Sequence, residues 1–445
     1  MTPKDTHPRE LKSNKIIQNK LRKINFQELE IKSGFVQRKP RKIWGKVLLI
    51  SFLLMAMKGK NTFQQWAEYL SLLTGETVSK QGVWKRINEQ LSIFLSAVLL
   101  DLLEQQLCDF SRQLKHHRGC LKNYHRVLLQ DSTTLALPTC LKWCYPGNIS
   151  KGKKKAQLKL QVVYDLISEC FINFEITAFN VNDQSKSKDI IKVANDKDLV
   201  IRDLGYFVLD CFEEMIQQNI NFISRLRYGI SIFDADKQEP MVLLKQLKKY
   251  GNFDGWVKIG KKSQLRVRLV AIKLPNTQAN ARRRKAKQNR DKRLNHSKEY
   301  YELLGYHIFI TSEESDRITS AQIADLYGLR WRIETIFKCW KSYFHLQKLF
   351  PQHGSLNKER VESIIYMFLI FILLTFVTIY NYLQKDIETE EDYKISIAKL
   401  SRFIANHIEL ILLDKPRLRL PKASYYCRYD KRYDRKNHIQ KLILS

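Results

Sequence analysis

Hydrophobic residues recur at helical spacing between residues 43 and 110. Within this part, NTFQQWAEYLSLL and KQGVWKRINEQLSIFLSAVLLDLL flank the polar segment TGETVS. This order predicts a helix, a turn and a second helix, with Ser79 as the N-cap of the second. The pair is either an ordinary helical hairpin or a helix-turn-helix. In the second case, the residues presented to DNA are Lys80, Gln81, Lys85 and Arg86.

After residue 119 the pattern changes to short β-rich runs. RVLLQDSTTLALP, KLQVVYDLI and CFINFEITAFN predict three successive strands. NDQSKSKDIIKVAND then predicts a helix, DLVIRDLGYF a strand, CFEEMIQQN a helix and NFISRLR a strand. This order predicts an α/β fold in which a mixed sheet carries helices on its faces.

Residues 228–300 have the pattern of an insertion into that fold. WVKIG and QLRVRLVAIKL predict strands, and ARRRKAKQNRDKR then places eight basic residues in thirteen positions. The basic run is either a solvated loop or a loop that contacts phosphates through Arg282, Arg283 and Arg284. After a further strand in YHIFITS, the segment TSAQIADLYGLRWRIETIFKCWKSYF predicts one helix.

The 17 residues IIYMFLIFILLTFVTIY, at 364–380, are uncharged and almost entirely apolar. Their length is just below that of a membrane-spanning helix, so they form either a marginal span or a buried core helix, and we favour the core helix. The patterns together predict five parts. These are a basic arm at 1–42, a helical region at 43–118, a mixed-sheet core at 119–227 and 301–385, a β-rich basic insertion at 228–300, and a helical, basic appendage at 386–445.

Charge narrows the choice of partner. Lys and Arg outnumber Asp and Glu by 77 to 45, a formal net charge of +32. Such an excess repels itself unless a polyanion neutralises it, so nucleic acid is the first expected partner and anionic lipid the second. The eight cysteines lack the spacing of zinc ligands. With no apolar signal region at the N-terminus, we expect reduced thiols in a cytoplasmic protein.

The predicted helix around residue 334 combines a charged and an apolar face. At about 100° per residue, one face collects Tyr327, Arg330, Glu334 and Lys341, with Lys338 beside them. The other face collects only apolar residues, namely Leu329, Ile333, Ile336, Phe337, Trp340 and Phe344. The charged side is either a solvated face on which Glu334 pairs with its basic neighbours or part of a functional site.

Two further acids lie where predicted strands present side chains to the rim of the sheet. Asp131 precedes Ser132 in the first strand, and Asp203 precedes Gly205 where the fourth strand leaves the sheet. Each is either a turn or capping acid or a site residue, because ligand sites form at the carboxyl ends of such strands. With Glu334 they would be three carboxylates, which can hold two Mg²⁺ ions about 4 Å apart for phosphoryl transfer.

These residues resemble the DDE transposases of the IS4 type, which are enzymes of bacterial insertion sequences. Their signature is Tyr, two residues, Arg, three residues, Glu, six residues and Lys, which matches Tyr327, Arg330, Glu334 and Lys341. Asp131 in LLQDSTTL and Asp203 in IRDLGYF resemble the family's two aspartates. The resemblance covers residues 45 to 385 and implies an RNase H-like core with an insertion before the glutamate.

By that resemblance, Asp131, Asp203 and Glu334 are catalytic and bind two Mg²⁺ or Mn²⁺ ions. Tyr327, Arg330 and Lys341 would contact phosphates at the transposon end, and Tyr306 or His307 would stack on a flipped base. The reaction implied is hydrolysis at the transposon end, followed by attack of the 3′-OH on target DNA within a homodimeric synaptic complex, without a membrane. The alternatives are a catalytically inactive, transposase-derived DNA-binding protein and a basic membrane protein.

Overall fold

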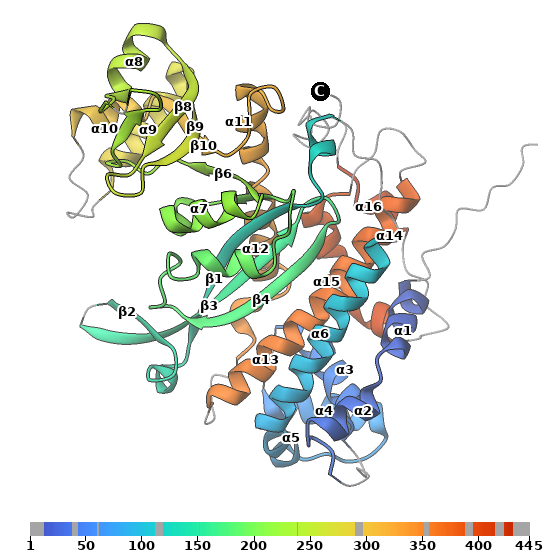
Figure 1. Ribbon diagram of the computed structural model, residues 1–445. Helices are drawn as coiled ribbons and strands as arrows, with labels where there is room; N and C mark the ends of the chain where they lie inside the picture. Colours follow the sequence, from blue (N-terminus) through green and yellow to red (C-terminus); the bar gives the residue numbers. More distant parts are fainter. Residues whose placement is uncertain are drawn as a thin grey trace, which may run out of the picture.

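The computed structural model describes residues 13–37, 43–59, 62–111, 119–150, 152–237, 239–289, 297–350, 356–387, 395–413 and 422–429. It combines a long, twisted sheet with a layer of helices along one side (Figure 1). The expected mixed sheet is therefore confirmed, and so is a helical N-terminal region.

The centre of the sheet is built from the five strands that the sequence predicts between residues 119 and 227. They are β1 (Val127–Leu137), β3 (Lys153–Asp165), β4 (Cys170–Ala178), β5 (Leu199–Arg202) and β6 (Asn221–Arg225). β3 lies antiparallel between β1 and β4, whereas β5 and β6 run parallel to β1. A strand that the sequence analysis missed, β2 (Pro146–Ser150), forms a hairpin with the start of β3.

The insertion continues this sheet. Its neighbours follow in the order β6, β10 (Tyr306–Thr311), β9 (Leu265–Lys273), β8 (Phe253–Ile259) and β7 (Ile232–Asp234), all antiparallel. The predicted strands are thus present as β8, β9 and β10, whereas β7 was not expected. Three helices accompany them: α8 (Leu243–Tyr250), α9 (Asn276–Lys287) and α10 (Lys298–Leu303). The expectation of a loop is wrong for residues 282–287, which lie in α9, and residues 290–296 lie outside the described part.

The N-terminal helices pack into the protein. α1 (Ser13–Lys23) buries Ile17 and Leu21, and α2 (Phe26–Lys32) buries Glu30, so the expected basic arm is wrong for residues 13–37. Residues 1–12 lie outside the described part. The next helices are α3 (Gly45–Ala56), α4 (Phe63–Thr74), α5 (Lys80–Arg86) and α6 (Glu89–Ser111). The Ser79 hydroxyl accepts a hydrogen bond from the Gly82 N–H at 3.1 Å, which confirms the predicted N-cap of α5.

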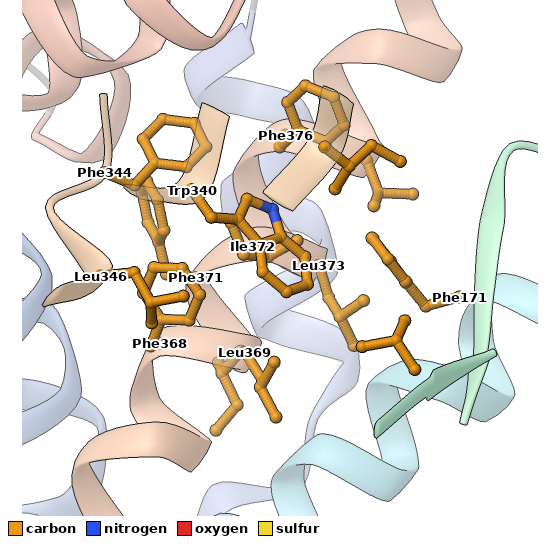
Figure 2. Close-up of a cluster of buried hydrophobic side chains, with 14 of the residues drawn as sticks. Phe171, Trp340, Phe344, Leu346, Phe368, Leu369, Phe371, Ile372, Leu373 and Phe376 are labelled. Carbon is orange, nitrogen blue, oxygen red and sulfur yellow. The ribbon is translucent and has the colours of Figure 1, made fainter. Parts of the chain in front are cut away.

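The apolar segment after residue 363 is a core helix. α13 (Lys358–Phe371), a π-helical stretch (Ile372–Val377) and α14 (Thr378–Ile387) form one continuous helix. The stretch Lys358–Gln384 is long and apolar enough to cross a membrane, but 94% of its most apolar window is buried inside the protein. Its side chains pack in the aromatic cluster around Trp340 (Figure 2). The helix thus has its apolar partners within the same chain.

The C-terminal region and the segment before β5 also differ from expectation. α15 (Ile397–Leu412) buries Leu400 and Ile404 in the same apolar cluster as α3 and α13, so it is part of the core rather than an appendage. α16 (Ala423–Tyr426) follows it. The predicted helix at 182–196 is only a 3₁₀ stretch, Ser187–Lys192, whereas α7 (Leu209–Gln217) is a helix as expected.

The predicted single helix around Glu334 is two helices. α11 (Ser320–Gly328) ends just before Leu329, and α12 (Trp331–Ser342) begins after Arg330. Between them the N–H groups of Leu329, Arg330 and Arg332 donate to carbonyls three residues earlier, which is 3₁₀ rather than α spacing. This turn separates the two helices, so Tyr327 belongs to α11 and Glu334 to α12. The apolar face is as predicted, because Leu329, Ile333 and Trp340 are buried.

Candidate functional site

Asp131 and Asp203 lie on the same face of the sheet. Strand side chains alternate between faces, and Gln130 of β1 pairs with Arg202 of β5 in parallel register. Arg202 is buried beneath α7, where its guanidinium donates to Cys211 Sγ at 3.2 Å. The next residue of each strand therefore points to the opposite face, towards α12. Asp203 is still extended, with φ −79° and ψ 166°, so this alternation holds at the strand end.

α12 brings Glu334 to this face through Arg330. The Arg330 guanidinium lies 2.7 Å from the Glu334 carboxylate and 3.6 Å from the Asp131 carboxylate. Only 8% of the Arg330 side chain is exposed, so it bridges the two acids in a largely dry position. Its pKa is raised, because Tyr327 and the three carboxylates outweigh the effect of burial. The structure thus places acids from β1, the end of β5 and α12 around one cation.

The Asp131 carboxylate carries the clearest electrostatic strain. Burial, together with the nearby charges of Asp203 and Glu334, raises the pKa of Asp131 to about 6, against the lowering effects of Ser132 and Arg330. The Ser132 N–H donates to the Asp131 carboxylate at 2.8 Å. One arginine therefore does not offset the desolvation and the mutual repulsion of the acids. A further cation at this position would be stabilised.

The chemistry of these residues fits divalent metal ions, although their spacing is not that of a preformed cage. Carboxylate oxygens are the ligands that Mg²⁺ and Mn²⁺ prefer. Among the described residues, no group of three His, Cys, Asp or Glu side chains is close enough to hold one ion. Arg330 lies between Asp131 and Glu334, and these carboxylates with Asp203 are the groups that would hold such ions. The cysteines at positions 140, 144, 170, 211, 339 and 427 are free thiols.

A second cationic group borders the acids on the side of β6 and β10. The Arg225 guanidinium, at the end of β6, lies 5.1 Å from the Tyr327 ring centroid. Tyr327 is buried and packs on Phe309 at 5.1 Å between ring centroids. Sequence analysis missed Arg225, although it follows a buried parallel strand beside that of Asp203, which is the signal that could have identified it.

The two candidate stacking residues of β10 point to opposite faces. Phe309 pairs directly with Arg225, and His307 shares the face of Phe309, with 5.6 Å between their ring centroids. Tyr306 packs instead on the apolar cluster beneath the other face. Burial, Arg282 and Arg225 lower the pKa of His307 to about 4, so its ring is neutral at physiological pH. Of the pair, His307 is the one on the same side as Tyr327.

The remaining predicted DNA-binding residues are scattered. Lys338 is exposed, with its ammonium 5.9 Å from the Trp331 ring centroid, and burial lowers the pKa of Lys341 on the same helix. Lys80 and Lys85 are exposed on α5. Arg86 is half-buried instead: its guanidinium donates to the Phe35 carbonyl at 3.4 Å and lies over the Phe35 ring.

The three arginines of α9 also differ from one another. Arg282 donates to the Tyr306 carbonyl at 2.9 Å, and Arg283 donates to the Tyr301 carbonyl at 2.9 Å. These two guanidinium groups therefore tie α9 to the segment before β10. Arg284 is exposed. Of the three, only Arg284 has the exposed side chain that a phosphate contact requires.

A polar network that sequence analysis missed supports the turn at Asp203. Lys159 donates to Asp183 at 2.9 Å, and Gln161 donates to the same carboxylate at 3.1 Å. Gln161 also accepts a hydrogen bond from Tyr206, three residues after Asp203. Because Gln161 pairs with Ser132 across β1 and β3, the network links the two aspartate-bearing segments. Its residues come from distant loops and strands, so no local motif indicates it.

Comparison with known proteins gives one consistent result. A family model described as "Transposase DDE domain" matches residues 123–368. The chain is 28% identical over 409 residues to the transposase for insertion sequence element IS231B of Bacillus thuringiensis subsp. berliner, covering 87% of this chain and 83% of the relative. It is 27% identical over 401 residues to the transposase for insertion sequence element IS1151 of Clostridium perfringens, covering 83% of this chain and 80% of the relative.

Proposed function

The chain belongs to the family of transposases with a DDE domain, and from this premise we propose that Asp131, Asp203 and Glu334 form its catalytic site. The observation that carries the proposal is the approach of these acids from three separate elements to one buried arginine, Arg330. An exposed helix face would leave Glu334 solvated and far from both aspartates. The site therefore favours the catalytic interpretation over a solvated ion pair.

The family acts with divalent metal ions, and we propose that two Mg²⁺ or Mn²⁺ ions are held by the three carboxylates. When bound, such ions activate the attacking oxygen and stabilise the leaving oxygen of a phosphodiester. The raised pKa of Asp131 supports this assignment, because a buried carboxylate with acidic neighbours gains most from added positive charge. In the absence of metal ions, the positive charge of Arg330 partly offsets the repulsion between the Asp131 and Glu334 carboxylates.

The protein is a DDE transposase of an insertion sequence, which cleaves the DNA strand at the element's end and joins the resulting 3′-OH to target DNA. We propose that Tyr327, Arg330, Lys338 and Lys341 hold phosphates beside the cut. The planar guanidinium of Arg330 can form two parallel hydrogen bonds to a phosphate, which an ammonium cannot. We assign Lys80 and Lys85 of α5 and Arg284 of α9 to more distant phosphates because they are exposed.

We further propose that the catalytic core is RNase H-like. The strand order β4, β3, β1, β5, β6, with three antiparallel strands followed by two parallel ones, supports this assignment. His307 is our candidate for stacking on a displaced base, because it lies on the same face as Phe309 and Arg225. Since transposition joins two ends of one element, we propose a homodimer that assembles on DNA in the cytoplasm, at the nucleoid.

Loss of metal-dependent nicking in carboxylate variants tests the proposed site. Wild-type protein is expected to nick a supercoiled plasmid carrying the element's end in the presence of Mg²⁺, and chelation is expected to abolish nicking. Asp131→Asn and Glu334→Gln are expected to lose nicking while still binding the end duplex. Glu213→Gln, which alters an exposed glutamate of α7, is the matched control and should nick normally.

The same assay can reject the proposal. Nicking at the wild-type rate by either site variant would exclude that carboxylate from catalysis. If the wild type binds the end duplex and nicks with neither Mg²⁺ nor Mn²⁺, the inactive, transposase-derived DNA-binding protein would be the correct alternative.

A further inference from the structure

A lysine-rich hairpin extends the sheet beyond the three carboxylates. Residues 139–155 contain five lysines and no Asp or Glu. The hairpin of β2 and the start of β3 projects away from the helical layer, at the lower left of the molecule (Figure 1). At its base, Leu141 and Tyr145 are buried, and the Tyr145 hydroxyl lies 3.3 Å from the Glu362 carboxylate of α13. The hairpin is therefore anchored to the body while its outer part faces solvent.

An exposed tryptophan lies among the lysines of this hairpin. The Trp143 side chain is 78% exposed, the most of the large hydrophobic residues in the described part of the chain. The ammonium groups of Lys142 and Lys154 lie 5.3 and 6.0 Å from its ring centroid. Neither ammonium forms an ion pair with a carboxylate of the residues that the structure describes. We call Lys142, Trp143 and Lys154 the hairpin cluster.

The hairpin cluster is on the same face of the sheet as Asp131. Asp131 pairs with Val162 of β3, and paired residues share a face. Lys154 is separated from Val162 by an even number of positions and therefore lies on that face, whereas Lys153 and Lys155 lie on the opposite one. At about 3.3 Å per residue, Lys154 is about 26 Å from the level of Asp131 along the continuous strand β3.

We propose that the hairpin cluster binds duplex DNA about eight base pairs from the phosphate cleaved at the carboxylates. The inference rests on the proposed catalytic site, because the distance is counted from Asp131 at about 3.4 Å per base pair. The two lysines neutralise backbone phosphates, and the indole ring contacts a sugar or base with its apolar face. The same chemistry serves DNA of the element's end and DNA flanking the cut.

Two charge-matched double variants test the proposal within the same hairpin. Lys142→Gln/Lys154→Gln removes two cations from the face of Asp131, and Lys153→Gln/Lys155→Gln removes two from the other face. Binding of an end duplex is measured as a function of salt. The first variant is expected to lower the slope of log Kobs against log[salt] by about 2, as for two lost phosphate contacts. The second should change it by less than half as much.

Trp143→Ala separates the ring from the charges. It is expected to weaken binding about tenfold without changing the salt slope, because stacking on an aromatic ring is not an ionic contact. An unchanged slope in the first double variant, or an equal change in both double variants, would overturn the proposal. Unchanged affinity in Trp143→Ala would also overturn the role of the ring. Thermal unfolding of each variant checks that the exposed substitutions leave the fold intact.

Shortened duplexes identify which DNA is bound. The duplex is shortened to fewer than about eight base pairs on either the element side or the flanking side of the cut. Shortening one of these sides, and not the other, should erase the difference in salt slope between wild type and Lys142→Gln/Lys154→Gln. A difference that survives shortening on both sides would contradict the proposed position. Nicking in Mg²⁺ is measured in parallel, so that a failure of the carboxylate assignment is distinguished from a failure of the hairpin assignment.

Discussion

Arg330 and Asp131 are the residues at which the site's charges are least balanced. Arg330 offsets two carboxylates at once, at 2.7 and 3.6 Å, while the Asp131 carboxylate is only 17% exposed. An acid that ligates metal or contacts substrate charge is commonly held at a cost to stability when the site is empty. The raised pKa of Asp131 is the measurable sign of that cost.

Removing the Asp131 charge is expected to stabilise the metal-free protein at neutral pH. The folded-state pKa of about 6 lies above the ordinary value of 3.8, so the penalty on the folded state is absent below about pH 4, grows as the pH rises from about 4 to about 6, and is complete above about 6. Asp131→Asn should therefore raise the free energy of unfolding at pH 7.5 by up to about 3 kcal/mol, at 1.36 kcal/mol per pKa unit. Urea unfolding in chelator measures it.

The pH dependence provides the control for this prediction. The difference between Asp131→Asn and wild type should shrink as the pH is lowered from 7.5 to 5, because the wild-type carboxyl becomes protonated in the folded state. Glu213→Gln should show no such trend, because its side chain is exposed. A lower free energy of unfolding in Asp131→Asn at pH 7.5 would contradict the prediction, because it would show that the ionised carboxylate stabilises the folded protein.

At the scale of elements, the position of Glu334 depends on the apolar back of α12. Trp340 is 1% exposed and lies among the rings of Phe171, Phe337 and Phe368, at 5.4 to 5.6 Å between centroids (Figure 2). These rings come from β4, α12 itself and α13. The helix that carries Glu334 is thus fixed between the sheet and the long apolar helix.

Truncation of Trp340 is expected to destabilise the protein and to impair nicking. Trp340→Ala should lower the free energy of unfolding by about 3–5 kcal/mol, because it leaves a cavity where several rings meet. Trp340→Phe should cost less, since it keeps a ring and removes an indole N–H that has no described hydrogen-bond partner. Denaturant unfolding measures both, with exposed Trp331→Ala as the control. An equal loss in the control would contradict the assignment.

At the scale of the whole molecule, the net charge of the chain and the need to bring two ends of the element together govern the assembly of the dimer. A net charge of +32 opposes association of free chains. DNA phosphates neutralise that charge, so we expect chains to pair when they bind end duplexes. Light scattering of the saturated complex should give a mass of two chains with two duplexes. A complex of one chain with one duplex at saturation would contradict the proposed dimer, and a duplex of unrelated sequence is the control.

The sequence by itself determined the family, most of the strands and the main core helix. The Tyr327, Arg330, Glu334 and Lys341 spacing is local, and so are the alternating strands and the 17-residue apolar run. Local patterns are read directly from short-range periodicity. The same locality explains the correct N-cap at Ser79, whose partner Gly82 is three residues away.

Tertiary structure alone decided which residues meet. The packing of α1 and α15 into the core depends on contacts between segments far apart in the sequence, and the hydrogen bonds of Arg282 and Arg283 to backbone carbonyls join α9 to residues about 20 positions away. Arg225 and the Asp183 network join the site for the same reason. Periodicity indicates which side of an element is apolar, but not which other element covers it, because that depends on how the whole chain buries its surface.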